Sequence, residues 1–248
     1  MKAFFNYLWI EFKVDLRDKG LLLNFYLVPL AFFFVMGAVF SSVTPLMKAT
    51  LSASMTIFAI TMGAVMGAPT ALVKMRESGT MRAFKVNGIS GTAVLAVHAL
   101  STFIHLFIVS VIIYFVAPLV FHAQAPASAA AYFGVMAVFL LASIGIGMLI
   151  GVTAPNQTYT TMMTMLIFLP SLLLSGIMFP AEMLPSALRQ VGRLFPATYS
   201  LQSLYGLAFQ LETSIDPYVS LFWVAAIAVL MFAIAFWRLN DLRKNEQH

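Results

Sequence analysis

The sequence predicts an all-α integral membrane protein with six transmembrane helices, an N-terminal interfacial amphipathic helix and a re-entrant outer segment between spans five and six. Three observations support this fold class. Hydrophobic residues make up 61% of the chain. Charged residues make up only 9%, whereas a soluble domain has roughly 25%. The few charges cluster between long apolar runs, and residues 86–181 carry none at all.

Composition also narrows the classes of function. The chain has no cysteine, which excludes disulfides, thiolate metal sites and a cysteine nucleophile. Its net charge is +5, but the basic residues flank apolar runs and do not form a separate basic domain. We therefore expect contact with the head groups of membrane lipids and no binding of nucleic acid. We expect neither catalytic residues nor metal ligands.

Residues 1–20 are expected to form a cytoplasmic interfacial helix. Apolar side chains recur there at helical spacing, while Glu11, Lys13 and Asp15 lie on other faces. This pattern is typical of an amphipathic helix that lies at a membrane surface. The alternative is a plain extension of the first span, but the Asp-Lys-Gly sequence at 18–20 favours a break between the two. The apolar positions are Phe5, Leu8, Trp9, Phe12 and Leu16.

Six segments are long and apolar enough to cross a bilayer. About 20 residues are needed, since each helical residue rises 1.5 Å. Pro118 and the stretches 122–126 and 155–157 interrupt the long uncharged run where turns are required. An even number of spans places both termini on one side of the membrane. The expected spans are residues 21–40, 50–73, 92–117, 130–152, 158–174 and 217–237.

The distribution of Lys and Arg predicts the orientation. With a cytoplasmic N-terminus, eleven of the fourteen basic residues lie inside, and only Lys48, Arg189 and Arg193 lie outside. Inner loops of membrane proteins carry the excess of Lys and Arg. We therefore expect a multi-pass protein of the inner or plasma membrane, with the N-terminus and His248 both in the cytoplasm.

Residues 74–88 are expected to form a cytoplasmic coupling loop or helix. Its charges lie between two uncharged stretches, and each ionised side chain would cost roughly 2.5–3.5 kcal/mol at the bilayer centre. The segment must therefore lie outside the membrane. It either contacts a partner or, as the alternative, is a solvated loop that only fixes the topology.

Residues 175–216 are too many for a turn and too apolar for an ordinary exposed loop. Pro180, Pro185 and Pro196 divide them into short pieces that suggest short helices dipping into the outer leaflet. Non-helical backbone at this depth is tolerated only when protein buries it or when it lines a cavity. We expect an ordered lid or wall. No domain boundary is evident, so residues 1–248 are expected to form one transmembrane permease domain.

Two sequence patterns resemble permeases of the type-2 ATP-binding-cassette exporter family. In that family a short cytoplasmic helix with an Arg-Glu-x-Gly-Thr motif docks on the ATPase subunit, and residues 76–80 match it. The stretch 173–180, followed by 184–185 and 195–199, resembles the family's Leu-Ser-Gly, Phe-Pro, Leu-Pro and Asn-Pro-Leu-Thr-Tyr pattern. Phe195 and Ala197 stand where Asn and Leu are usual, a departure that affects packing more than the assignment.

The resemblance implies the membrane half of an ATP-driven exporter. The partners would be an ATPase subunit and a second permease copy, identical or homologous. The chain contains no phosphate-binding Gly-x-x-x-x-Gly-Lys-Ser/Thr loop, so it is not expected to be an enzyme or to bind a cofactor; ATP and Mg would sit on the ATPase. The residues expected to couple to the ATPase are Arg76, Glu77, Ser78, Gly79, Thr80, Met81, Arg82 and Phe84.

The expected cargo is lipophilic or amphipathic, such as a drug, antibiotic or lipid-like molecule, which would give multidrug or antibiotic resistance; a polysaccharide stays an alternative. Flexible methionine side chains adapt to irregular apolar ligands. In the resembled family the second and fifth helices contribute to the transport path. The candidate path residues are therefore Met55, Met62, Met66, Thr161, Thr164 and Met165.

The alternative from another class is a secondary transporter or channel that uses His98 and His105. These residues lie seven apart on one face of the third span, and polar groups at this depth can mark a proton path. They more often hydrogen-bond neighbouring helices, and the sequence shows no carboxylate near them, so we expect a packing role. An intramembrane serine protease is not supported, because Leu173 occupies a position where its Gly-x-Ser-Gly motif requires glycine.

Overall fold

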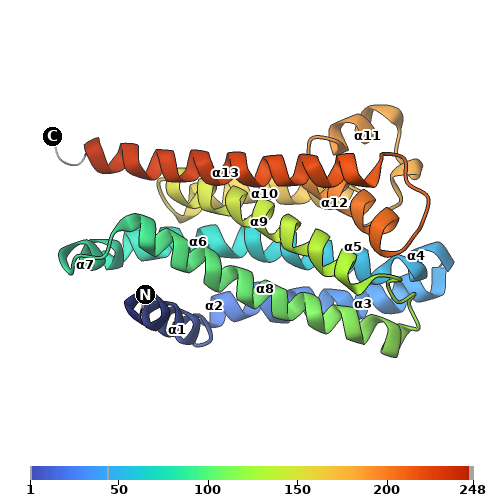
Figure 1. Ribbon diagram of the computed structural model, residues 1–248, viewed down its shortest axis with the longest axis horizontal. Coiled ribbons are helices and arrows are strands. Elements are labelled where there is room, and N and C mark those ends of the chain that lie inside the picture. Colours follow the sequence, from blue (N-terminus) through green and yellow to red (C-terminus); the bar gives the residue numbers. More distant parts are fainter. Residues whose placement is uncertain (1, 44, 246–248) are drawn as a thin grey trace.

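The computed structural model, which describes residues 2–43 and 45–245, is a bundle of six long helices (Figure 1). All regular elements in the described residues are helical, and six helices have the length and composition of membrane spans. This confirms the predicted all-α class with six membrane-spanning helices. The spans are Lys19–Ser42, Leu51–Glu77, Gly91–Phe121, Ala129–Thr153, Gln157–Leu174 and Pro217–Asp241.

Two of the spans contain wide, π-helical turns. The first span comprises α2 (Lys19–Leu22), the π turn η1 (Leu23–Leu27) and α3 (Val28–Val43). The second comprises α5 (Leu51–Thr61), the π turn η2 (Met62–Gly67) and α6 (Ala68–Glu77). The other four are α8 (Gly91–Phe121), α9 (Ala129–Thr153), α10 (Gln157–Leu174) and α13 (Pro217–Asn245). Shorter helices outside the spans are α1 (Lys2–Asp15), α4 (Pro45–Ala49) and α7 (Thr80–Val86).

The second and fourth spans form the centre of the bundle. Their most apolar stretches are 83% and 72% buried, against 22–33% for the other four spans. Glycine allows this close packing, because a Cβ atom added to Gly147 of α9 would overlap the backbone oxygen of Ala64 in η2. The Gly-x-x-x-Gly pattern at 147–151 therefore marks a real close approach between two helices.

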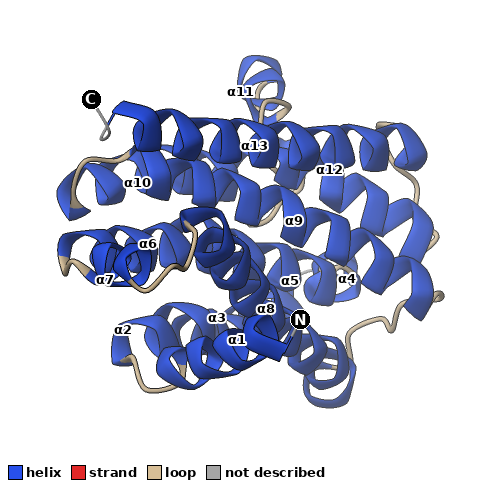
Figure 2. Ribbon diagram, turned by 60° about the vertical axis from the view of Figure 1, so that its left-hand side comes forward, coloured by secondary structure: helices blue, strands red, loops and turns tan. Residues whose placement is uncertain are grey.

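The ends of the bundle carry different elements. At one end lie α1, α7 and the last described residues of α13, and we call this the α7 end (Figure 1). The opposite end carries α4 and α11 (Ser186–Gly192), and we call it the α11 end. Turning the molecule by 60° shows α1 lying against α8, next to α2 (Figure 2). Both ends of the described chain thus lie at the α7 end, whereas Met1 and His248 are outside the described residues.

The segment between the fifth and sixth spans folds into four short helices, namely η3 (Ala181–Met183), α11, α12 (Pro196–Ser203) and the π turn η4 (Leu204–Ala208). Pro180, Pro185 and Pro196 stand at the starts of the first three, where a missing backbone N–H costs nothing. Buried side chains of α12 pack against α13, α9 and α5. The segment is ordered by these contacts, and its depth in a bilayer stays a prediction.

The second span continues one turn beyond the residue where its charge-free run ends. Val73 is fully buried, and the helix runs on through Lys74 and Arg76 to Glu77. Long cationic side chains can extend from a helix end to polar partners, so charge alone does not end a helix. The sixth span is extended in the same way, past Trp237 to Asn245.

Replacing Gly147 by alanine is expected to lower the stability of the bundle by about 1–3 kcal/mol, because the new methyl group meets backbone that cannot move aside. The control is Gly134→Ala in the same helix, where a Cβ meets nothing within 4 Å. That change should be neutral or stabilise by up to roughly 1 kcal/mol through helix propensity. Thermal unfolding in one detergent measures both. Equal midpoints for the two variants would contradict the close contact.

Candidate functional site

A sharp bend joins the second span to α7. The helix α6 ends at Glu77, Ser78 caps it, and Gly79 adopts φ 77°, in the left-handed region that favours glycine. A Cβ atom at Gly79 would meet nothing within 4 Å, so the backbone angle alone accounts for the glycine. The hydroxyls of Ser78 and Thr80 hydrogen-bond across the bend at 2.8 Å. The chain therefore leaves the second span in a fixed direction.

The short helix α7 lies at the surface: its residues 82, 83, 85 and 86 are exposed, and 80, 81 and 84 are half-buried. None of its residues is buried, and the apolar side chain of Val86 is 81% exposed. On its inner side Met81 packs against the main hydrophobic core, and the ring of Phe84 lies 5.3 Å from that of Tyr7 in α1. The helix is thus anchored on one side, while Arg82 on the other faces solvent.

Two charged residues of the coupling motif bind the turn between α9 and α10. The Arg76 guanidinium donates to the carbonyl oxygen of Val152 at 3.1 Å and to that of Ala154. The carbonyl of Val152 is among the last of α9, which have no partner within the helix, and Ala154 is the residue that caps the helix. The Glu77 carboxylate accepts from the backbone N–H of Gln157, the first residue of α10, at 3.2 Å. Arg76 and Glu77 therefore tie the second span to the fourth and fifth.

The same end of α6 also holds the turn between α1 and α2. The Lys74 ammonium lies 2.6 Å from Oδ2 of Asp18, and this hydrogen bond holds the pKa of Asp18 below its usual value. Oδ1 of Asp18 accepts from the backbone N–H groups of Gly20 and Leu21 and so caps α2. The end of α6 is thus tied to the turn between α1 and the first span.

A cavity of about 860 Å³ opens beside this bend, at the α7 end of the bundle. It lies between α6, α7, the start of α8 and the ends of α9 and α13. Of the eight predicted coupling residues, five line it, and Ser78, Thr80 and Phe84 do not. The five are Arg76, Glu77, Gly79, Met81 and Arg82.

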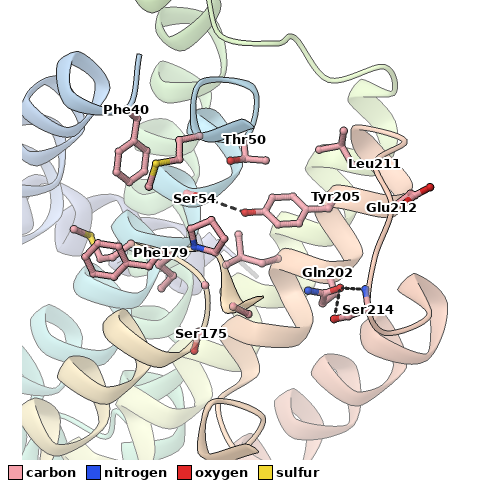
Figure 3. A pocket seen from close by; sticks show the side chains of 17 residues that line it. Phe40, Thr50, Ser54, Ser175, Phe179, Gln202, Tyr205, Leu211, Glu212 and Ser214 are labelled. Atoms are coloured by element: carbon pink, nitrogen blue, oxygen red, sulfur yellow. Dashed lines mark hydrogen bonds between the residues drawn. The ribbon is translucent and has the colours of Figure 1, made fainter. Parts of the chain in front are cut away.

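A second, smaller cavity of about 150 Å³ lies at the α11 end (Figure 3). Apolar side chains, Phe40 and Phe179 among them, line one part of it. Hydroxyl and amide groups line the rest, including Ser54, which hydrogen-bonds the Tyr205 hydroxyl at 3.3 Å, and Gln202. Sequence reasoning missed this site, because its walls come from residues more than a hundred positions apart.

None of the six candidate path residues lines either of these cavities. Met55, Met62 and Thr164 are buried, Met66 is half-buried, and Thr161 and Met165 are exposed on α10. The two threonine hydroxyls donate to carbonyl oxygens of their own helix, those of Gln157 and Thr161. Such bonds occupy the hydroxyl proton, and only the acceptor lone pairs stay available.

One expectation was wrong: carboxylates do lie beside the two histidines. Glu11 Oε1 is 3.5 Å from Nδ1 of His98, and Asp15 Oδ2 is 3.6 Å from Nε2 of His105. The reason is that α1 turns its charged face inward against α8. Burial, together with the charges of Glu11 and Asp15, also raises the pKa of the Tyr7 hydroxyl.

The apolar face of α1 points outward, with Phe5 62% and Trp9 58% exposed. A soluble helix would bury this face, whereas a helix at a membrane can offer it to lipid. Within the described residues, no group of three or more His, Cys, Asp or Glu side chains is placed to hold a metal ion.

Comparisons with known proteins support the family resemblance. The family described as "ABC-2 type transporter" matches residues 2–209. A protein of Escherichia coli K12, named "probable multidrug ABC transporter permease YbhS", is 29% identical over 105 residues, which cover 42% of this chain and 28% of that protein. The protein of the same name from Escherichia coli O157:H7 gives the same values. The match thus spans less than a third of the length of these relatives.

Replacing Arg76 by alanine is expected to destabilise the bundle by about 1.5–3 kcal/mol, the usual contribution of hydrogen bonds from a charged group. The control is Arg82→Ala, at an exposed position of α7, which should change stability by less than about 0.5 kcal/mol. Thermal unfolding of the purified chain compares them. If Arg76→Ala were as stable as the control, the hydrogen bonds of Arg76 to the end of α9 would not contribute to the stability of the bundle.

Proposed function

Because this chain belongs to the ABC-2 type transporter family, we propose that it is the membrane-spanning subunit of an ATP-driven exporter. Its six apolar helices supply the multi-pass membrane domain of such a transporter. The chain itself has no nucleotide-binding loop, so ATP and Mg are bound by a separate ATPase subunit. Two permease domains, identical or homologous, stand side by side above two ATPase subunits.

The observation that carries this proposal is the geometry of α7. An exposed helix without a buried residue is joined by a fixed bend to the most buried span of the bundle. A partner that pushes on α7 therefore displaces the centre of the molecule and not a loose loop. Nucleotide can shift the equilibrium between two permease conformations only through different affinity for them, and an ATPase docked on α7 supplies that difference.

The eight coupling residues divide into three roles in this proposal. Arg82, exposed on α7, contacts the ATPase. Arg76 and Glu77 pass the displacement to the fourth and fifth spans through the turn between α9 and α10. The remaining residues fix the position of α7: Ser78, Gly79 and Thr80 form the bend, and Met81 and Phe84 form the anchor.

The proposed cargo is lipophilic or amphipathic. Two features support this: a relative is named as a multidrug permease, and the cavity at the α11 end combines aromatic with hydroxyl and amide groups. Exposed Thr161 and Met165 on α10 line the path between two permease copies, and buried Met55, Met62 and Thr164, together with half-buried Met66, support its wall. The cavity at the α11 end, closed by residues 175–181, is the exit.

The α7 end is expected to face the cytoplasm, since it carries most of the basic residues. Single cysteines test this on the cysteine-free chain. A membrane-impermeant maleimide added to intact cells should label Arg189→Cys in α11 but not Arg82→Cys in α7, and should reach the latter after permeabilisation. Both positions are exposed. Labelling of Arg82→Cys from outside would reverse the topology.

Reversing the charge of Arg82 with Arg82→Glu is expected to weaken ATPase binding by ~2–5 kcal/mol, roughly 30-fold or more, and to lower export in proportion. The affinity-tagged chain is purified from membranes of its own host. We then measure MgATP hydrolysis and the amount of retained polypeptide that contains a nucleotide-binding loop. Gly79→Pro should act in the same direction, because proline cannot adopt φ 77°.

The matched control is Arg189→Glu, an identical charge reversal at an exposed residue of the opposite end. It should leave ATPase retention at the wild-type level. If Arg82→Glu and Gly79→Pro, both inserted and folded, retained the ATPase and exported at the wild-type rate, then residues 74–88 would be a topology signal only, and the proposed coupling would fail.

A further inference from the structure

Four titratable side chains are buried together where α1 packs on the third span. Glu11 and Asp15 are one turn apart on α1, and His98 and His105 are two turns apart on α8. Their exposed fractions are 7%, 5%, 1% and 1% in that order. Ion pairs buried this deeply are uncommon, because removing charge from water is costly unless it is compensated. The coupling mechanism above does not use this cluster.

At His98 the hydrogen-bond partners determine where protons must be. Its Nε2 lies 3.1 Å from the carbonyl oxygen of Ala68. A carbonyl oxygen can only accept, so Nε2 carries a hydrogen. The other nitrogen, Nδ1, faces Glu11 Oε1 at 3.5 Å and has no hydrogen-bond donor in the described structure. With a neutral imidazole and an ionised carboxylate, two lone pairs would face each other.

The contact between Glu11 and His98 therefore requires one additional proton. It forms either as imidazolium with carboxylate or as imidazole with carboxylic acid, and in both forms the pair is neutral overall. Without the proton, a buried carboxylate would stand uncompensated against a lone pair.

The second pair needs no additional proton. Nδ1 of His105 lies 2.7 Å from the Tyr26 hydroxyl, which can donate to it. Nε2 then carries the hydrogen and faces Asp15 Oδ2 at 3.6 Å. The same oxygen accepts from Ser101 Oγ at 2.6 Å. With a neutral His105 and an ionised Asp15, an N–H group therefore faces an acceptor oxygen, and no two lone pairs are brought together.

The remaining titratable groups around the site are few. Tyr7 of α1 and Tyr26 of η1 face it, and Tyr7 presents a buried hydroxyl without a partner in the described structure. From α6 the site receives only the carbonyl of Ala68. The charged side chains Arg82 and Lys85 of α7 are exposed, and Lys74 lies with Asp18 beyond the end of α1.

We propose that Glu11 and His98 form a buried proton-binding site, and that the bound proton holds the N-terminal helix α1 against the third span. The sign of the pH dependence follows from linkage. Packed α1 holds a proton that the separated side chains release above about pH 6.5, the ordinary pKa of histidine. The equilibrium between packed and released α1 should then shift toward release by about tenfold for each pH unit above that value.

Hydrogen–deuterium exchange of residues 4–15 measures this equilibrium in the chain reconstituted in lipid nanodiscs, without any ATPase. After correction for intrinsic exchange, protection of the wild type should fall by about tenfold between pH 7 and pH 8. In Glu11→Gln the amide donates to Nδ1 without a titrating proton, so protection should change by less than about twofold. If the protection of residues 4–15 in the wild type does not fall as the pH rises, the proposal is overturned. This result does not depend on whether the variant folds.

The matched control is Asp15→Asn, one turn further along the same face. Its amide oxygen can still face the N–H of His105 Nε2, so the site at Glu11 and the fall in protection should both persist. Two other results overturn the proposal. The same slope in Glu11→Gln as in the wild type would show a general effect of pH on the bundle, and a slope lost in Asp15→Asn but kept in Glu11→Gln would place the proton at the second pair. Because no ATPase is present, these outcomes are independent of the coupling test.

Discussion

The close contact between the second and fourth spans is the constraint on which the rest of the structure depends. Their backbones touch at Gly147 and Ala64, and this contact fixes the second span at the centre of the bundle. Every other span packs around this pair. A span enclosed on all sides cannot bend independently of its neighbours, because protein interiors are as closely packed as crystals. A force applied at the end of α6 should therefore also displace the spans packed against it.

The end of α6 is where the separate parts are joined. Within one helical turn, Lys74 holds the turn before the first span, Arg76 holds the end of the fourth, and Glu77 holds the start of the fifth. Gly79 then reverses the chain into α7. Arg76 and Glu77, which the sequence suggested as contacts with an ATPase, thus also make contacts within the chain. This double use leaves the exposed face of α7 as the surface that we propose for recognition of the ATPase.

Sequence reasoning recovered the six spans because the bilayer imposes a rule that can be read along the chain. Charged residues are excluded from the hydrocarbon core, and an apolar run of about 20 residues is long enough to cross it. It missed the surroundings of the histidines, because Glu11 and His98 are 87 residues apart and periodicity reports only faces of one helix. The hydrophobic pattern of α1 assigned Phe5, Trp9 and Phe12 to one face, of which the first two are exposed and Phe12 is half-buried and stacks on His105. It could not tell which face meets protein, since at a membrane the apolar face can turn to lipid. The cavity at the α11 end could not be predicted either, because the residues that line it are also far apart in the sequence.

The lengths of the spans have a consequence for the surrounding lipid. The third span, α8, has 31 residues and is about 46 Å long, whereas the fifth, α10, has 18 and is about 27 Å long. A hydrocarbon core of about 30 Å matches neither. The bilayer must thin beside α10 or α8 must tilt, and both responses carry hydrophobic mismatch energy. The length of the lipid acyl chains in the host membrane should therefore affect the tilt of α8 relative to α10.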